Sequence, residues 1–121
     1  MLELTINEVE SKIKDSDFIA ITWMSKDCPV CENFEEIIDS ASKVLDKWVT
    51  YKIEMPHGGG LSWYEPHIAP TTYVFKQGVR QIVAPGETTE IDFIDTLSKI
   101  ERGIWKTQFE KELEQLERLD K

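Results

Sequence analysis

The sequence predicts an α/β fold with a mixed central sheet that helices flank on both faces. The run Phe18–Met24 is apolar at almost every position, which is typical of a central strand covered on both sides. A helical pattern and a second strand-like run follow it, and the three together form a β-α-β unit. A length of 121 residues is that of one domain.

The elements around the central strand are predicted from capping and periodicity. Thr5 and Glu8 fit a capping box, so we expect a helix that ends near Asp15. A second helix follows the central strand and ends near Asp46, with Pro29 in its first turn, where the missing N–H costs nothing. Its apolar face consists of Phe34, Ile37, Ile38, Ala41, Val44 and Leu45. Residues 48–53 form the next strand, which a right-handed crossover makes parallel to the first.

The second half of the chain predicts a hairpin and two helical stretches. Residues 73–75 and 80–83 are strands joined by a tight connection, and Thr89 caps the helix that follows. We divide the chain into a domain at 1–102 and an amphipathic helical extension at 103–121. We expect this extension to continue the preceding helix through Gly103, at a cost of about 1 kcal/mol relative to alanine.

The extension carries an apolar stripe of Trp105, Phe109, Leu113 and Leu116. Large exposed apolar patches are rare on monomers, so we expect this stripe to pack on its own domain. The alternative is contact with a second copy or a partner protein.

The charge balance excludes several classes of partner. Twenty-three acidic residues against 14 basic ones give a formal charge of −9, which repels a nucleic-acid backbone. The chain has no Lys/Arg-rich run for an anionic membrane and no apolar run long enough to span one. The amino terminus lacks the pattern of a signal peptide, so we expect a cytoplasmic protein in a reducing compartment.

Only two cysteines are present, Cys28 and Cys31, and two cannot form a disulfide scaffold. They lie where a helix is expected to begin. The free amides and dipole there stabilise the thiolate of the first cysteine and lower its pKa. The second cysteine lies one turn inward and can attack a mixed disulfide on the first. A C-x-x-C pair next to a β-α-β pattern therefore predicts redox chemistry.

Two other interpretations of the cysteines stay open. Cys28 and Cys31 could form a zinc site with His57 and His67, although the spacing completes no usual zinc pattern. They could also be unreactive reduced cysteines.

The order of these features resembles the thioredoxin family over about residues 5–102. The matching motifs are Cys28-Pro29-Val30-Cys31 on a helix, Ala69-Pro70-Thr71, and Phe-Lys-Gln-Gly at 75–78. The resemblance implies a thiol–disulfide oxidoreductase that acts on protein disulfides in cell redox homeostasis. It implies no metal or organic cofactor, and a thioredoxin reductase as the electron donor. It also implies a cis Pro70 that faces the dithiol, with the Ala69 backbone pairing with a bound substrate segment.

The active-site motif departs from the family beside the first cysteine. Asp27 stands where thioredoxins usually have Trp, and Pro29 directly after Cys28 is more similar to glutaredoxins and some disulfide oxidases. The charge of Asp27 opposes thiolate formation, unless Lys26 folds back to offset it.

A second departure lies on the central strand. The family has a buried Asp where this chain has Thr22, and a Lys on the neighbouring strand that Lys52 matches. Because Thr22 cannot act as a base, we expect Glu32 or water to take the proton of Cys31. We interpret Glu32, Glu35, Glu36 and Asp39 as the solvated face and first turns of the cysteine helix. These departures motivate a second hypothesis, a redox-inert adaptor that binds a partner protein.

Overall fold

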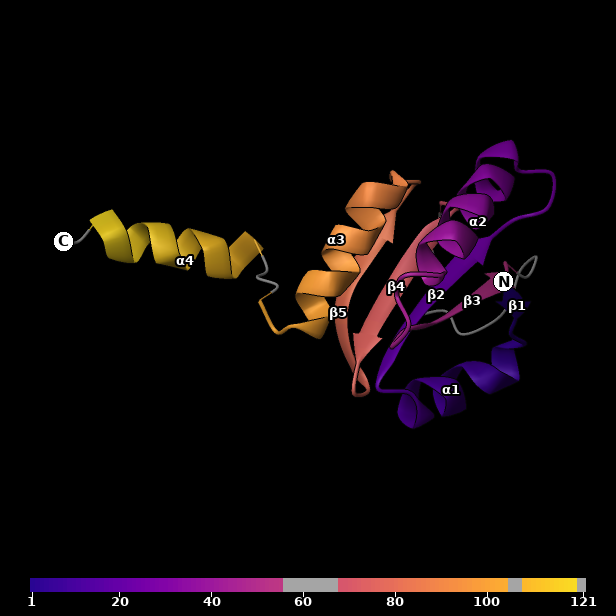
Figure 1. Cartoon of the computed structure of the whole chain (residues 1–121), viewed down its shortest axis with the longest axis horizontal. Helices are drawn as coiled ribbons and strands as arrows, with labels where there is room; N and C mark the ends of the chain where they lie inside the picture. Colours follow the sequence, from indigo (N-terminus) through magenta and orange to yellow (C-terminus); the bar gives the residue numbers. More distant parts are fainter. Residues whose placement is uncertain (56–67, 105–107, 120–121) are drawn as a thin grey trace.

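The computed structural model describes residues 1–55, 68–104 and 108–119, with residues 108–111 and 118–119 described by their backbone alone. A five-stranded mixed sheet forms the centre, in the order β1-β3-β2-β4-β5. Helix α1 covers one face, and α2 and α3 cover the other (Figure 1). The elements are β1 (Leu2–Glu3), the 3-10 turn η1 (Ile6–Glu8), α1 (Val9–Asp15), β2 (Phe18–Met24), α2 (Pro29–Ser42), β3 (Val49–Glu54), β4 (Thr71–Lys76), β5 (Val79–Pro85), α3 (Glu90–Glu101) and α4 (Gln108–Leu119).

The pairing of the strands confirms the predicted β-α-β unit. Strand β2 is central and pairs in parallel with β3 and antiparallel with β4. Trp23, near the end of β2, lies opposite Thr71 at the start of β4. The loop that leaves β2 and the segment that enters β4 therefore lie at the same end of the sheet.

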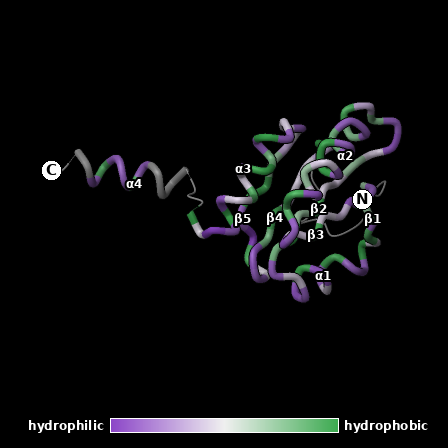
Figure 2. The backbone as a smooth tube through the Cα atoms, in the orientation of Figure 1, coloured by the Kyte–Doolittle hydropathy of each residue, from purple (hydrophilic) through white to green (hydrophobic). Residues whose placement is uncertain are grey.

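The two faces of β2 differ in what they contact. Ile19, Ile21 and Trp23 belong to the core under α1, whereas Ala20 and Met24 belong to the core under α2 and α3. Alternation along a strand places Thr22 on the α2 side with them. Hydrophobic and hydrophilic stretches alternate along α1, α2 and α3 in Figure 2, because each helix turns only one side to the sheet.

The predicted turns and caps are confirmed. The Glu8 carboxylate accepts hydrogen bonds from the backbone N–H and the hydroxyl of Thr5, at 3.0 and 2.9 Å. Thr89 Oγ1 accepts from the backbone N–H of Asp92 at the start of α3. The β4–β5 hairpin turns through Gln77 and Gly78, which both have positive φ, as a two-residue turn in a twisted hairpin requires.

Helix α2 ends at Ser42, so the expectation that it reaches Asp46 is wrong. The backbone N–H groups of Lys43 and Val44 bond to carbonyls three residues back, which tightens the last turn. This change of direction buries Leu45 and leaves Val44 63% exposed. A helical pattern of apolar residues continues past the point where the helix itself ends.

Helices α3 and α4 are separate, which corrects the prediction of one continuous helix. Gly103 has φ +72, the left-handed conformation that commonly follows the last turn of a helix. Figure 1 draws α4 to one side of the sheet, beyond α3. Leu113 and Leu116 are 43% and 57% exposed, so the predicted packing on the domain is wrong for these two residues. Trp105 and the side chain of Phe109 lie outside the described residues.

Strand β1 was not predicted. It contains two residues, Leu2 and Glu3, which pair in parallel with Tyr51 and Lys52 of β3. The backbone N–H of Leu4 then donates to the carbonyl of Lys52 at 2.8 Å.

Candidate active site

Cys28 and Cys31 form a disulfide at the amino end of α2. Cys28 is the N-cap residue, and Pro29 occupies the first turn as predicted. The two Cα atoms are 5.2 Å apart, which is within the usual span of a disulfide. The backbone N–H of Cys31 donates to Sγ of Cys28 at 3.2 Å. The first sulfur therefore occupies the place where a helix end stabilises negative charge.

The two cysteines differ in their access to solvent. Cys28 is half-buried, whereas Cys31 is only 2% exposed and packs in the core with Phe34. Pro29 and Val30, between them, are exposed. An external disulfide can reach Cys28, and Cys31 lies behind it.

The predicted Ala69–Pro70 segment enters β4 at the same end of the sheet. The Ala69–Pro70 bond is cis. The Thr71 hydroxyl donates to the Ile68 carbonyl at 2.6 Å, and the Gly86 N–H donates to the Pro70 carbonyl at 2.7 Å. Ala69 and Cys28 are both partly buried against the same core cluster.

The residues just before the dithiol form a tight turn. Asp27 is exposed and has φ +53, a conformation that Asp and Asn adopt more readily than most side chains. Lys26 does not fold back toward it in this structure: its ammonium lies 3.6 Å from the Glu54 carboxylate. The left-handed backbone conformation at this position therefore favours an Asp, independently of the effect of its charge on Cys28.

Thr22 and Lys52 lie side by side on the sheet under α2. They are register partners on β2 and β3, and Thr72 of β4 is the partner of Thr22 on the other side. Thr22 and Thr72 are buried, and their hydroxyls form a hydrogen bond of 3.0 Å. The hydroxyl of Thr22 is satisfied by a neighbouring strand.

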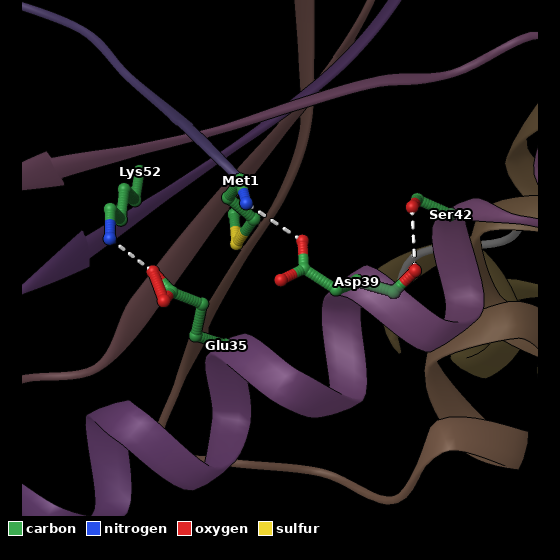
Figure 3. A network of polar contacts seen from close by, with 5 residues as sticks. All are labelled: Met1, Glu35, Asp39, Ser42 and Lys52. Carbon is green, nitrogen blue, oxygen red and sulfur yellow. Dashed lines mark hydrogen bonds and ion pairs between the residues drawn. The ribbon is translucent and has the colours of Figure 1, made fainter.

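Lys52 instead contacts helix α2, where its ammonium forms a hydrogen-bonded ion pair with the Glu35 carboxylate (Figure 3). Accepting this hydrogen bond, the carboxylate raises the pKa of Lys52. One turn further along, the Met1 amino group lies 2.9 Å from the Asp39 carboxylate. The interpretation of these carboxylates as a solvated face is wrong for Glu35, which is half-buried. It holds for Glu32 and Glu36, which are exposed.

Sequence reasoning therefore missed Glu35 as a residue of the site. Glu35 lies four residues after Cys31, and residues at this spacing share one face of a helix. Cys31, Glu35 and Lys52 all line a cavity of about 210 Å³ beside the disulfide. The spacing from the second cysteine was the signal that could have found it.

Comparison with solved structures decides the fold. The structure is similar to the oxidised thioredoxin of Plasmodium falciparum, with a TM-score of 0.70 and 17% identity over 83% of this chain and 98% of that one. Chlamydomonas reinhardtii thioredoxin f2 also gives 0.70, with 13% identity over 88% and 99% of the two chains. The chain has a thioredoxin fold.

A third similar structure is a mutant thioredoxin from Halobacterium salinarum, with a TM-score of 0.70 and 19% identity over 81% of this chain and 86% of that one. No protein-family model matches the sequence, and no curated protein matches it either. The likeness to these thioredoxins therefore concerns the fold, an α/β arrangement of five strands flanked by helices, which here carries a C-x-x-C pair.

Two further findings concern the other classes considered. His57 and His67, which the zinc hypothesis needs, lie outside the described residues, and residues 1–55, 68–104 and 108–119 contain no group of three potential metal ligands. In the same part of the chain, no helix combines the length and apolar character of a membrane span.

Proposed function

We propose that this protein is a thiol–disulfide oxidoreductase that exchanges its Cys28–Cys31 dithiol with disulfides of client proteins. One observation carries the proposal: the two cysteines are bonded at the amino end of α2, with Cys28 reachable and Cys31 buried behind it. This asymmetry supports an attacking role for Cys28 and a resolving role for Cys31.

The reaction proceeds in two exchanges. The Cys28 thiolate attacks one sulfur of the client disulfide, forming a mixed disulfide and releasing the other client sulfur as a thiolate. Cys31 loses its proton and attacks Cys28 Sγ, which breaks the bond to the client. The client gains two electrons and two protons, and the dithiol becomes the Cys28–Cys31 disulfide. Neither exchange requires a metal or an organic cofactor.

The segment at the entry to β4 supports recognition of extended client chains. Ala69 and the cis Pro70 lie at the same end of the sheet as Cys28. We propose that the Ala69 backbone pairs with the client segment next to the scissile disulfide, as a strand adds to the edge of a sheet. Asp27 and Pro29, on either side of Cys28, tune its thiolate.

Continuous turnover requires a source of electrons. We propose that a reductase of the thioredoxin reductase class returns the disulfide to the dithiol. The adaptor hypothesis requires no such donor, because its function does not consume the dithiol.

Reduction of a two-chain protein held together by disulfides tests the proposal. Wild type supplied with dithiothreitol should accelerate separation of the chains, and Cys28→Ser should lose the acceleration. Serine is a favourable N-cap, so this variant keeps the helix start intact. No acceleration by wild type would overturn the proposal and leave the adaptor hypothesis. A zinc module would instead retain stoichiometric metal that is lost on changing His57 or His67.

A further inference from the structure

The resolving step of the proposed reaction requires a base next to a buried thiol. A free thiol has a pKa of about 8.5, so only a few per cent of it is thiolate at neutral pH. Cys31 is 2% exposed, which limits direct loss of its proton to bulk water. Thr22 has no basic group, and its hydroxyl is bonded to Thr72.

The cavity beside Cys31 contains a carboxylate in a suitable place. Glu35 lies one helical turn after Cys31 on the same face of α2, and both residues line the cavity. The ion pair with Lys52 of β3 holds the Glu35 side chain against the sheet (Figure 3). A cavity of about 210 Å³ has room for several waters, each of which occupies about 30 Å³ in the liquid.

We propose that Glu35 is the proton acceptor for Cys31, acting through a water in this cavity, and that Lys52 is the residue that positions it. The inference rests on the proposed function. It concerns only the second exchange, since Cys28 lies at the helix start and is partly exposed to solvent.

The step balances without another reactant. The Cys31 thiol gives its proton through the water to the Glu35 carboxylate, and its sulfur attacks Cys28 Sγ. The bond between Cys28 and the client sulfur breaks, and the client leaves as a thiolate. Glu35 then returns the proton through solvent to that thiolate and is ionised for the next cycle.

Other charged groups face the same cavity, and the geometry distinguishes them from Glu35. They are Glu3 of β1, Lys26 after β2, Glu32 of α2, and Lys52 and Glu54 of β3, while Asp39 acts on Lys52 from the next turn of α2. Glu32 adjoins Cys31 in sequence, and consecutive residues on a helix do not face each other. Glu3 and Glu32 are also exposed, and Glu54 lies beside Lys26.

Release of an aromatic thiolate from dithiobis-nitrobenzoate separates the two exchanges. The reduced protein releases one thiolate when Cys28 attacks the reagent, and a second when Cys31 resolves the mixed disulfide. The second phase is intramolecular, so its rate does not depend on reagent concentration, and Cys31→Ser should lack it. Both rates are measured from about pH 5 to about pH 9, which brackets the ordinary titration of a thiol.

Glu35→Gln should leave the first phase unchanged and slow the second about tenfold or more at neutral pH. Its second phase should also rise about tenfold per pH unit up to the thiol pKa, because only free thiolate then reacts. The second phase of wild type should depend less steeply on pH over the same interval, because a carboxylate accepts the proton. The matched control Glu36→Gln, at an exposed position on the same helix, should stay within about twofold of wild type. Glu32→Gln tests the alternative acceptor.

Lys52 gives a second set of variants, which decides the question if Glu35→Gln does not fold. Lys52→Arg keeps a cation that can pair with Glu35 and should preserve the second phase, whereas Lys52→Met should slow it. Equal second phases in wild type, Glu35→Gln and Lys52→Met would overturn the inference and leave the proposed function standing. A slow second phase in Glu32→Gln alone would assign the role to Glu32. Absence of the first phase in wild type would overturn the proposed function itself.

Discussion

The two faces of the central sheet differ in the side chains that line them. Under α1, strand β2 contributes Ile19, Ile21 and Trp23, which belong to an apolar core cluster. Under α2, the same strand contributes Thr22, and its register partner on β3 is the charged Lys52. Both of these residues have a polar partner: Thr22 has Thr72, and Lys52 has Glu35.

The difference shows that polar residues are buried on the α2 face of the sheet. A buried polar group is costly unless it is hydrogen-bonded, so a row of polar residues under α2 is less favourable for packing than the apolar row under α1. Lys52, at one end of this row, lines the cavity at Cys31. The α1 face is therefore apolar along β2, whereas the α2 face combines an apolar core with two polar pairs.

The largest expected effect is a loss of stability caused by a substitution in the apolar core under α1. Trp23 is fully buried and makes an edge-on contact with Tyr73, with ring centroids 6.5 Å apart. Trp23→Ala should lower the free energy of unfolding by about 3–5 kcal/mol, measured by urea denaturation, because it leaves a large cavity. Val79→Ala, at an exposed position, is the control and should have little effect. A loss below about 1 kcal/mol for Trp23→Ala would contradict the packing of Trp23 in the core of the α1 face.

A smaller effect is expected from the polar pair on the other face. Thr22→Val leaves the buried Thr72 hydroxyl without its partner and should cost about 1–3 kcal/mol of unfolding free energy. The double change Thr22→Val with Thr72→Val removes both hydroxyls and should recover most of that loss. Urea denaturation of all four members of this double-mutant cycle measures the coupling. Simple additivity of the two changes would show that the hydrogen bond does not support this face.

The thiolate at the end of α2 gives a kinetic test of the same face. Asp27→Asn removes a negative charge beside Cys28, and Asn tolerates the left-handed conformation at this position. It should speed the first exchange about two- to fivefold at low salt, with less gain at high salt. Asp46→Asn, beyond the far end of α2, is the control. An equal gain from both changes would rule out a local effect.

The smallest expected effect is a pH-dependent change in stability from the capping box that precedes α1. The backbone N–H of Thr5 donates to the Glu8 carboxylate, which lowers the pKa of Glu8. The resulting stability is present above the ordinary pKa of a carboxylate and is lost as the pH falls through the lowered one. Glu8→Gln should therefore melt slightly below wild type at neutral pH and match it in acid. A difference that persists in strong acid would show that the capping charge is not its cause.

The fold was predictable wherever local patterns agree with packing. The continuous apolar run of β2 and the caps at Thr5 and Thr89 correspond to elements that the structure confirms. The end of α2 was not predictable, because the apolar spacing that includes Leu45 continues through a tightened turn. Strand β1 has only two residues, too few for any periodicity.

The candidate site was predictable at the cysteines but not at the residues that support them. The spacing of Cys28 and Cys31 is local, and the structure joins them as the pattern indicates. In the sequence, Glu35 is one of several charges on an amphipathic helix, and only the register of β3 brings Lys52 next to it. A contact between a helix and a strand 17 residues away is a property of the tertiary fold, which local patterns do not contain.

The most direct test of the central claim is to trap the mixed disulfide. Reduced Cys31→Ser, mixed with a disulfide-containing client protein and analysed by intact mass, should accumulate one client molecule bound through Cys28. Cys28→Ser should accumulate none, because Cys31 is buried. Wild type should pass through the adduct and finish as the Cys28–Cys31 disulfide with a reduced client. If Cys31→Ser forms no adduct, or if Cys28→Ser forms it equally well, the assignment of attacking and resolving cysteines is wrong.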